Sequence, residues 1–244
     1  MLRKLVNISL IALMFSMSEV IAYAGTTGSE ELKKSNTSET ASECFEGLSR
    51  AMFKLNHGLD KVIFKPVAKG YRALPVPVRK ATGNVTDNLR SLLTLSNNLL
   101  QGDFRKAGDT AGRFAVNTTV GVLGIFDPAS KLGLEDHGKE DFGQTLGKWG
   151  SDSGCYFVLP ILGPTTARDA VGLVGNVFLD PVYQITHNTE IDNGIVGNGN
   201  YSEHNYYYYR STGAVDFRAK NIESFDSLEE NSIDLYASLK SLYL

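Results

Sequence analysis

Apolar residues recur at three- and four-residue spacing after about residue 43, which is the period of an amphipathic helix. The first such stripe contains Met52, Leu55, Leu59, Val62 and Ile63. Lys65-Pro66 follows it, and a proline inside a helical pattern predicts that the helix stops or kinks there. The next segment, Leu74-Pro75-Val76-Pro77-Val78, predicts a rigid extended link.

Two further helices are expected between the link and residue 125. The stripe of the first is Val85, Leu89, Leu92, Ser96, Leu99 and Leu100. Asn84 is a candidate cap for it and Gly102 a candidate stop. Asp103 is expected to cap the second, whose stripe is Phe104, Ala107, Ala111, Phe114 and Thr118.

The last part of the chain predicts three more helices, over Thr165–Phe178, Tyr201–Ala219 and Asn231–Tyr243. The first of these carries Ala170, Gly172 and Gly175, and such small residues let either lipid tails or neighbouring helices approach the backbone closely. Almost no segment alternates with the period of a strand. The sequence therefore predicts a mainly α fold.

One segment does not fit a helix, and it combines turn-forming residues with an apolar run. Tyr156–Leu162 is apolar and lies between Gly154 and Gly163-Pro164. This pattern favours an apolar hairpin displayed on a helical scaffold, and such a hairpin must be buried against something.

Charge and composition narrow the classes of function. The chain has 244 residues and a formal net charge of -3, with a pI near 5.8, so no basic field indicates a nucleic-acid partner. Residues 1–24 have the charged start, apolar stretch and Ala22-Tyr23-Ala24 site of a secretory signal peptide, and the alternative is an N-terminal membrane anchor that stays attached. We expect a polar, flexible tether at 25–42, a helical domain at 43–222 and an amphipathic helix or tail at 223–244.

The sequence has few candidate metal-binding, catalytic or ligand-binding residues. The four His residues are scattered and there are only two cysteines, so we expect no metal site. Cys44 and Cys155 permit one disulfide in an exported chain, or two buried thiols. Glu140 and Asp141 are possible acid–base carboxylates, although Asp141 is better explained as a turn or cap residue. A basic cluster could meet lipid head groups or simply face solvent: Lys65, Lys69, Arg72, Arg79 and Lys80.

Several motifs in one order resemble the MlaA family, also called VacJ-like outer-membrane proteins. In chain order they are 45–53 (FEGLSRAMF), 65–72 (KPVAKGYR), 97–102 (NNLLQG), 111–114 (AGRF), 117–121 (NTTVG), 126–129 (FDPA), 140–147 (EDFGQTLG), 159–164 (LPILGP) and Arg168-Asp169. Ser49 stands where the family usually has Asn. Each motif is weak alone, and the shared order makes the resemblance specific.

The resemblance implies a ring-like bundle of amphipathic helices in the plane of one leaflet, the inner leaflet of a Gram-negative outer membrane. A hairpin borders a central amphipathic channel, which takes mislocalised phospholipid from the outer leaflet and passes it to a periplasmic carrier. Trimeric porins are implied as partners, with no catalysis and no cofactor. The channel and hairpin residues would be Gly154, Tyr156, Phe157, Leu159, Pro160, Leu162, Gly163 and Pro164. Head-group contacts would be Lys65, Lys69, Arg72 and Arg168.

The chain departs from the family in ways that matter for anchoring. Family members usually have Cys directly after the signal peptide, whereas position 25 is Gly, so N-terminal lipidation is not expected. Cys44 and Cys155 both stand where the family typically has Pro, which favours a bond between them.

Two other functions stay open. One is a lipid-cleaving enzyme that uses Asp141 or Asp152 with His137. The other is a structural or adhesion protein whose apolar hairpin is a partner interface.

Overall fold

The computed structural model describes residues 43–187 and 203–244, and the expected signal peptide and tether lie outside them. The described part is mainly helical, with one two-stranded hairpin. In chain order the elements are α2 (Glu46–Leu59), the π-helical turn η1 (Asp60–Phe64), α3 (Lys65–Arg72), α4 (Val76–Leu100), α5 (Phe104–Thr119), α6 (Pro128–Lys131), α7 (Phe142–Lys148), β1 (Tyr156–Leu159), β2 (Gly163–Thr166), α8 (Ala167–Leu179), α9 (Pro181–His187), α10 (Glu203–Lys220), α11 (Ile222–Asn231) and α12 (Leu235–Tyr243).

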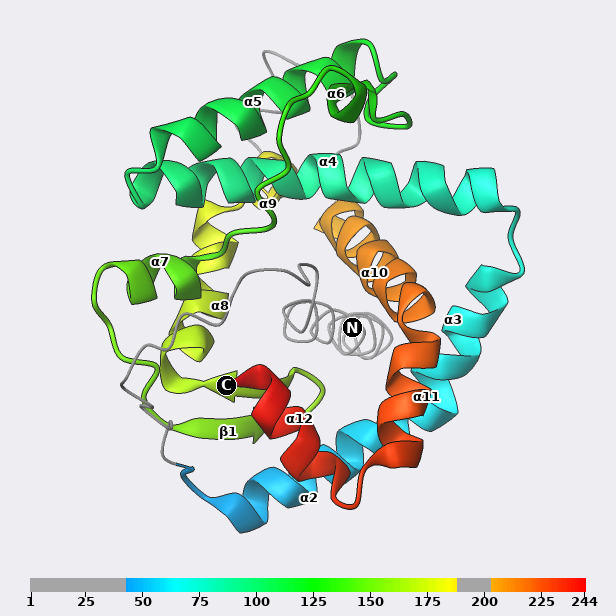
Figure 1. Ribbon diagram of the computed structural model, residues 1–244, viewed down its shortest axis with the longest axis vertical. Helices are drawn as coiled ribbons and strands as arrows, with labels where there is room; N and C mark the ends of the chain where they lie inside the picture. The colour runs from blue at the N-terminus through cyan, green and yellow to red at the C-terminus, as the bar shows by residue number, and fades with distance from the viewer. Residues whose placement is uncertain (1–42, 188–202) are drawn as a thin grey trace.

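These elements form a ring (Figure 1). Helix α4 makes one side, with α5 and α6 outside it, and α2 with the hairpin and α12 make the opposite side. Helices α3, α10 and α11 connect the two sides along one flank, and α7 with α8 along the other. The expected mainly helical, ring-like architecture is confirmed.

The sequence predicted a stop or a kink at Lys65-Pro66. The stop is wrong, because the helical path continues through Pro66, and the regular helix is instead interrupted by the π-helical turn just before it. The amide of Lys65 donates to the carbonyl of Asp60, five residues back, in the wider turn η1. This turn places Pro66 in the first turn of α3, where a helix tolerates a residue without an amide hydrogen. The three elements α2, η1 and α3 therefore form one continuous arc of the ring.

The expected extended link over 74–78 is also mostly wrong. Helix α4 already begins at Val76, with Pro77 in its first turn, so only Ala73 to Pro75 separate α3 from α4. Asn84 consequently lies inside α4 instead of capping it. Its side-chain amide donates to the carbonyl of Ile125, 2.9 Å away, and so ties α4 to the segment after α5.

The predicted end of α4 at Gly102 and the predicted N-cap of α5 at Asp103 are confirmed. Gly102 follows α4 with a φ of 72°, a left-handed conformation that favours glycine. The side chain of Asp103 then accepts a hydrogen bond from the amide of Lys106 and caps α5. The tight turn lays α5 antiparallel along α4.

The small residues of α8 serve tight helix packing. A Cβ added at Gly172 would lie 2.5 Å from the backbone nitrogen of Gly143 in α7, and one at Gly175 would lie 2.1 Å from the ring of Phe142. The helix begins at Ala167, with Thr166 as its cap, so Thr165 belongs to the hairpin. The other face of α8 exposes Val171, Val174 and Phe178.

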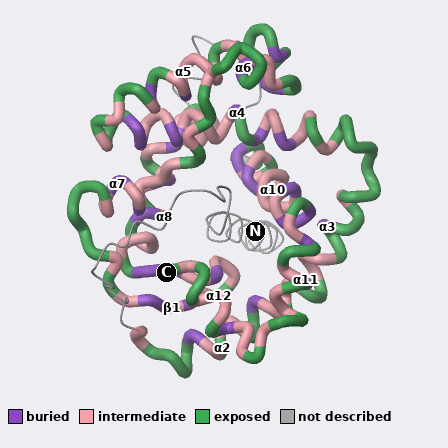
Figure 2. The backbone as a smooth tube through the Cα atoms, in the orientation of Figure 1, coloured by how far each residue is buried: buried purple, intermediate pink, exposed green. Residues whose placement is uncertain are grey.

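Burial is inverted relative to a water-soluble core. Of the ten buried hydrophobic residues in the described ranges, four are alanine, whereas 26 large hydrophobic side chains there are exposed. Many buried positions instead hold Asn or Thr, such as Asn97, Asn98 and Thr145. Figure 2 shows exposed residues along much of the outer perimeter, with buried ones on β1, α4 and α10. Exposed apolar surface on this scale requires an apolar partner.

Candidate functional site

The hairpin lies where the sequence predicted it, but it extends two residues further, to Thr166. Strands β1 and β2 pair antiparallel, with Tyr156 opposite Thr166 and Leu159 opposite Gly163. Ile161 in the turn and Gly163 at the start of β2 both have positive φ. Glycine at 163 is therefore required by the backbone conformation, and Ile161 adopts a left-handed conformation that is rare for a β-branched residue.

Helix α2 fixes the hairpin through two buried polar side chains. The hydroxyl of Ser49 accepts a hydrogen bond from the amide of Val158 at 3.3 Å. The amide group of Asn56 donates to the carbonyl of Leu159 at 2.8 Å, and its oxygen accepts from the amide of Ile161 at 2.6 Å. Because positions 49 and 56 are two helical turns apart, one face of α2 holds both the strand and the turn.

One side of the hairpin is buried against the C-terminal helix. Tyr156 is 0% exposed and Val158 4%, and both pack with Tyr236 of α12. The side chain of Tyr156 is therefore unavailable to a ligand, and it supports the hairpin instead of lining a channel. The pKa of Tyr156 is raised, first by burial and then by the nearby carboxylate of Glu43.

The other expected hairpin residues differ in their solvent exposure. Gly154 and Pro160 are exposed, Gly163 is buried, and four are half-buried: Phe157, Leu159, Leu162 and Pro164. The alternation along β1 turns Phe157 and Leu159 to the face opposite Tyr156 and Val158. The apolar surface that the hairpin offers is therefore built from Phe157, Leu159, Pro160 and Leu162.

The start of the described chain is joined to the hairpin base. Cys44 and Cys155 form a disulfide, with Cα atoms 5.6 Å apart. The amide of Cys44 also donates to the carbonyl of Tyr156 at 3.2 Å. Glu43 forms a parallel bridge with Tyr156, so β1 has a neighbour on both edges.

Glu43 also closes the ring onto α12. Its carboxylate accepts hydrogen bonds from the ammonium of Lys240 and the hydroxyl of Tyr236. Burial raises the pKa of Glu43, but these two hydrogen bonds outweigh it, and the net pKa lies below 4.5. The pair Arg50–Asp234, at 2.8 Å, adds a second contact between α2 and the start of α12.

The basic cluster expected to meet head groups is largely neutralised within the ring. Lys65 pairs with Asp226 at 2.7 Å, and Arg72 pairs with Glu223. Arg168 pairs with Asp169 at 2.9 Å, and Lys69 is exposed. The missed signal is the acidic spacing Glu223, Asp226 and Glu229 on α11, which faces the basic residues of η1 and α3. Segment 223–244 is thus part of the ring.

The structure contains a groove that sequence reasoning missed. It lies between α4 and α10, has a volume of about 420 Å³ and is mainly apolar. Its lining residues are Ala81, Thr82, Val85, Thr86, Leu89, Tyr208, Tyr209 and Thr212. A volume in this range suits a small apolar ligand or part of a larger one. The run Tyr206–Tyr209 was the only sequence signal for it.

The residues of the enzyme alternative do not come together. Asp141 caps α7 by accepting from the amide of Gln144 at 2.8 Å, and burial raises its pKa. His137 instead contacts Asp109 on α5 at 2.6 Å, and Asp152 is exposed. The described residues therefore provide no pairing of His137 with Asp141 or Asp152.

In the described ranges, no helix has both the length and the apolar character that crossing a bilayer requires. Helix α4 is the longest at 25 residues, but it carries buried Asn and Thr side chains that pair with other helices. Thr145 of α7, for example, donates to Asn97 at 2.8 Å.

Comparisons with known proteins agree on one family. The family model described as "MlaA lipoprotein" matches residues 41–244. A Rickettsia prowazekii protein, RP093, is 39% identical over 146 residues, which span 59% of this chain and 58% of that protein. The Haemophilus influenzae intermembrane phospholipid transport system lipoprotein MlaA is 30% identical over 93% of this chain and 85% of its own length.

A solved structure points the same way. It comes from work on the structural basis for maintenance of bacterial outer membrane lipid asymmetry, and it is 29% identical to this chain. The two structures superpose with a TM-score of 0.67, covering 83% of this chain and 95% of that one. The chain therefore belongs to the MlaA lipoprotein family.

Proposed function

We propose that this protein is an outer-membrane component of intermembrane phospholipid transport, which removes mislocalised phospholipid from the outer leaflet and so maintains lipid asymmetry. The relatives named for phospholipid transport support this function. The observation that carries it is the inverted burial, in which many large apolar side chains are exposed and many of the buried ones are polar. Such a molecule fits the acyl region of one leaflet, with its helices in the membrane plane.

The proposed path for a lipid is amphipathic. The apolar surface of the hairpin, at Phe157, Leu159, Pro160 and Leu162, would border it. The groove between α4 and α10 offers further apolar surface beside the hydroxyls of Tyr208 and Tyr209. An acyl chain can lie on the apolar part while water solvates the head group, so no covalent chemistry and no cofactor are needed.

A periplasmic lipid carrier is the proposed recipient, and a trimeric porin is the proposed neighbour in the membrane. The chain would be exported and located at the periplasmic face of a Gram-negative outer membrane, anchored by its apolar perimeter. Val171, Val174 and Phe178, on the face of α8 turned away from α7, are 58%, 61% and 70% exposed, which suits a surface that contacts acyl chains.

Lipid capture tests the proposal directly. Protein extracted in detergent should carry phospholipid that mass spectrometry identifies, and it should release fluorescent phospholipid from vesicles to an acceptor. Leu162→Glu, at the half-buried hairpin tip, should slow this release several-fold. Lys131→Glu is the control, because Lys131 is exposed and lies in α6, on the opposite side of the ring from the hairpin.

The test also separates the alternative functions. An enzyme would produce lysophospholipid or free fatty acid, which the same mass spectra would reveal. An adhesion protein would carry no lipid and would be indifferent to charge at Leu162. Release that is equal for wild type and Leu162→Glu would contradict the proposed path.

A further inference from the structure

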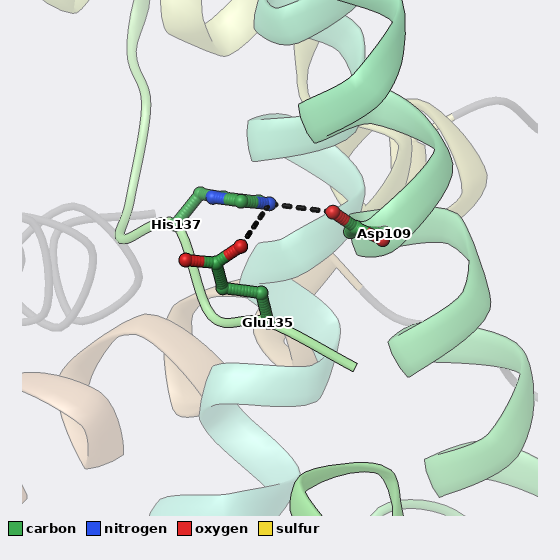
Figure 3. A group of neighbouring side chains, drawn as sticks. All are labelled: Asp109, Glu135 and His137. Carbon is green, nitrogen blue, oxygen red and sulfur yellow. Dashed lines mark hydrogen bonds and ion pairs between the residues drawn. The ribbon is translucent and has the colours of Figure 1, made fainter. Parts of the chain in front are cut away.

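Three side chains that bind metals in other proteins meet on the outer layer of the ring. Asp109 comes from α5, and Glu135 and His137 from the segment between α6 and α7 (Figure 3). The Nε2 atom of His137 lies 2.6 Å from a carboxylate oxygen of Asp109 and 3.9 Å from one of Glu135. All three ligand atoms lie within 4.8 Å of one another.

The backbone holds the two loop residues toward α5. Gly133 and Gly138 flank them with φ values of 78° and 83°, a left-handed backbone conformation that glycine adopts readily. Arg113 of α5 donates to the carbonyl of Leu134 at 2.8 Å. Because Arg113 is one helical turn after Asp109, the same face of α5 fixes the loop and supplies a ligand.

The arginines near the cluster are compatible with a bound cation. The charge of Arg113 is paired with Asp127 at 3.2 Å and Asp136 at 3.7 Å, neither of which is a proposed ligand. Arg105 contacts Glu135 at 3.3 Å, but the two side chains are 81% and 61% exposed. An exposed ion pair of this kind contributes little, so a divalent cation can take over Glu135 at small cost.

From this juxtaposition we propose that Asp109, Glu135 and His137 bind a zinc ion that fastens the 132–141 segment to α5. One imidazole and two carboxylates suit Zn²⁺, whereas Mg²⁺ and Ca²⁺ prefer oxygen ligands alone. The buried side of the site is His137, at 13% side-chain exposure, and the open side is Glu135. Three protein ligands leave a fourth position for water.

Binding requires only local movement. The Nε2 atom of His137 must present its lone pair to the metal, so its hydrogen bond to Asp109 is replaced by two metal–ligand bonds. In a tetrahedral zinc site each ligand atom lies about 2.0–2.1 Å from the ion, so the distances between ligand atoms are similar to one another. Here the Nε2 atom of His137 is 2.6 Å from Asp109 and 3.9 Å from Glu135, so these two distances must become more nearly equal. The exposed side chain of Glu135 supplies most of the adjustment.

Zinc titration of the full chain in detergent tests the site, after a chelator has removed bound metal. A chromophoric chelator should report one Zn²⁺ per chain, and Mg²⁺ should not compete. His137→Ala and Glu135→Gln should each weaken binding about tenfold or more. Glu135 is exposed, so Glu135→Gln removes a ligand without disturbing packing.

Asp136→Asn is the matched control, because it removes the same charge one residue away from a proposed ligand. It should leave zinc affinity unchanged, as should His57→Ala, whose histidine pairs with Glu229 elsewhere. Absence of stoichiometric zinc, or an equal loss in Asp136→Asn and Glu135→Gln, would overturn the proposal. The titration measures zinc binding and not lipid transfer, so its result is independent of transport activity.

Discussion

Asn56 of α2 donates a hydrogen bond to the carbonyl oxygen of Leu159, across 103 positions of sequence. Its side-chain oxygen also accepts from the amide of Ile161, so a single side chain satisfies both backbone groups at the hairpin turn. This contact sets the hairpin relative to the ring.

Asn56→Ala should lower the free energy of unfolding by about 1–3 kcal/mol, because it leaves buried polar groups without partners. Denaturant unfolding in detergent measures the change. Asn231→Ala is the control, since Asn231 is exposed and bonds only to Ser227 in its own helix. Equal effects of the two substitutions would show that Asn56 is not a special anchor.

The disulfide should resist alkylation until it is reduced. Cys44→Ser or Cys155→Ser should each cost about 2–4 kcal/mol, because the bridge constrains a long loop of the unfolded chain. The double variant should cost no more than either single one, since all three remove the same bond. Two thiols that react with alkylating reagent before reduction would contradict the bridge.

The contact between α7 and α8 should not tolerate a methyl group. Gly172→Ala places a Cβ against the backbone of Gly143, and overpacking of this kind costs about 1–3 kcal/mol. Gly108→Ala in α5 is the matched control, because nothing lies within 4 Å of its added Cβ. That control should stabilise α5 by about 0.5–1 kcal/mol. Thermal unfolding of both variants checks the contrast.

The contact between α3 and α11, made by the ion pairs Lys65–Asp226 and Arg72–Glu223, should weaken in acid. The hydrogen bond from Lys65 holds the pKa of Asp226 below 3.8, and that from Arg72 holds the pKa of Glu223 below 4.5. A carboxylate with a lowered folded-state pKa stabilises the fold above its unfolded pKa, and this contribution is lost as the pH falls through the folded value.

Hydrogen exchange of α11 between pH 6 and pH 3 measures this weakening. We expect protection to be constant down to about pH 4.5 and to fall below it. Asp226→Asn should lower the hydrogen-exchange protection of α11 already at pH 6, and it should make that protection depend less on pH. Protection that falls equally in α5 would indicate general acid unfolding instead.

The sequence predicted correctly those features of the structure that depend on residues close together in the chain. Gly102 and Asp103 predicted one helix end and the next helix start, because a left-handed glycine and an N-cap act within one turn. The hairpin was likewise evident from Gly154 and Gly163 around an apolar run.

Signals that depend on distant residues were misread. Pro66 was interpreted as a stop or kink and Pro77 as part of an extended link, but each lies in a first helical turn. The π-helical turn before Pro66 has no sequence signature. Lys65 and Arg72 were interpreted as facing either head groups or solvent, because their partners on α11 lie over 150 residues away in the sequence. The approach of His137 to Asp109, 28 residues earlier in the chain, likewise has no local sequence signal.

The scarcity of large apolar residues between the helices has an energetic consequence. Folding in water draws its main driving force from removing such side chains from solvent. Here Leu55, Val171 and Phe178 gain that benefit only when something non-aqueous surrounds them. Resistance to unfolding is thus set partly by the medium, and it should rise when dilute detergent is replaced by a lipid phase.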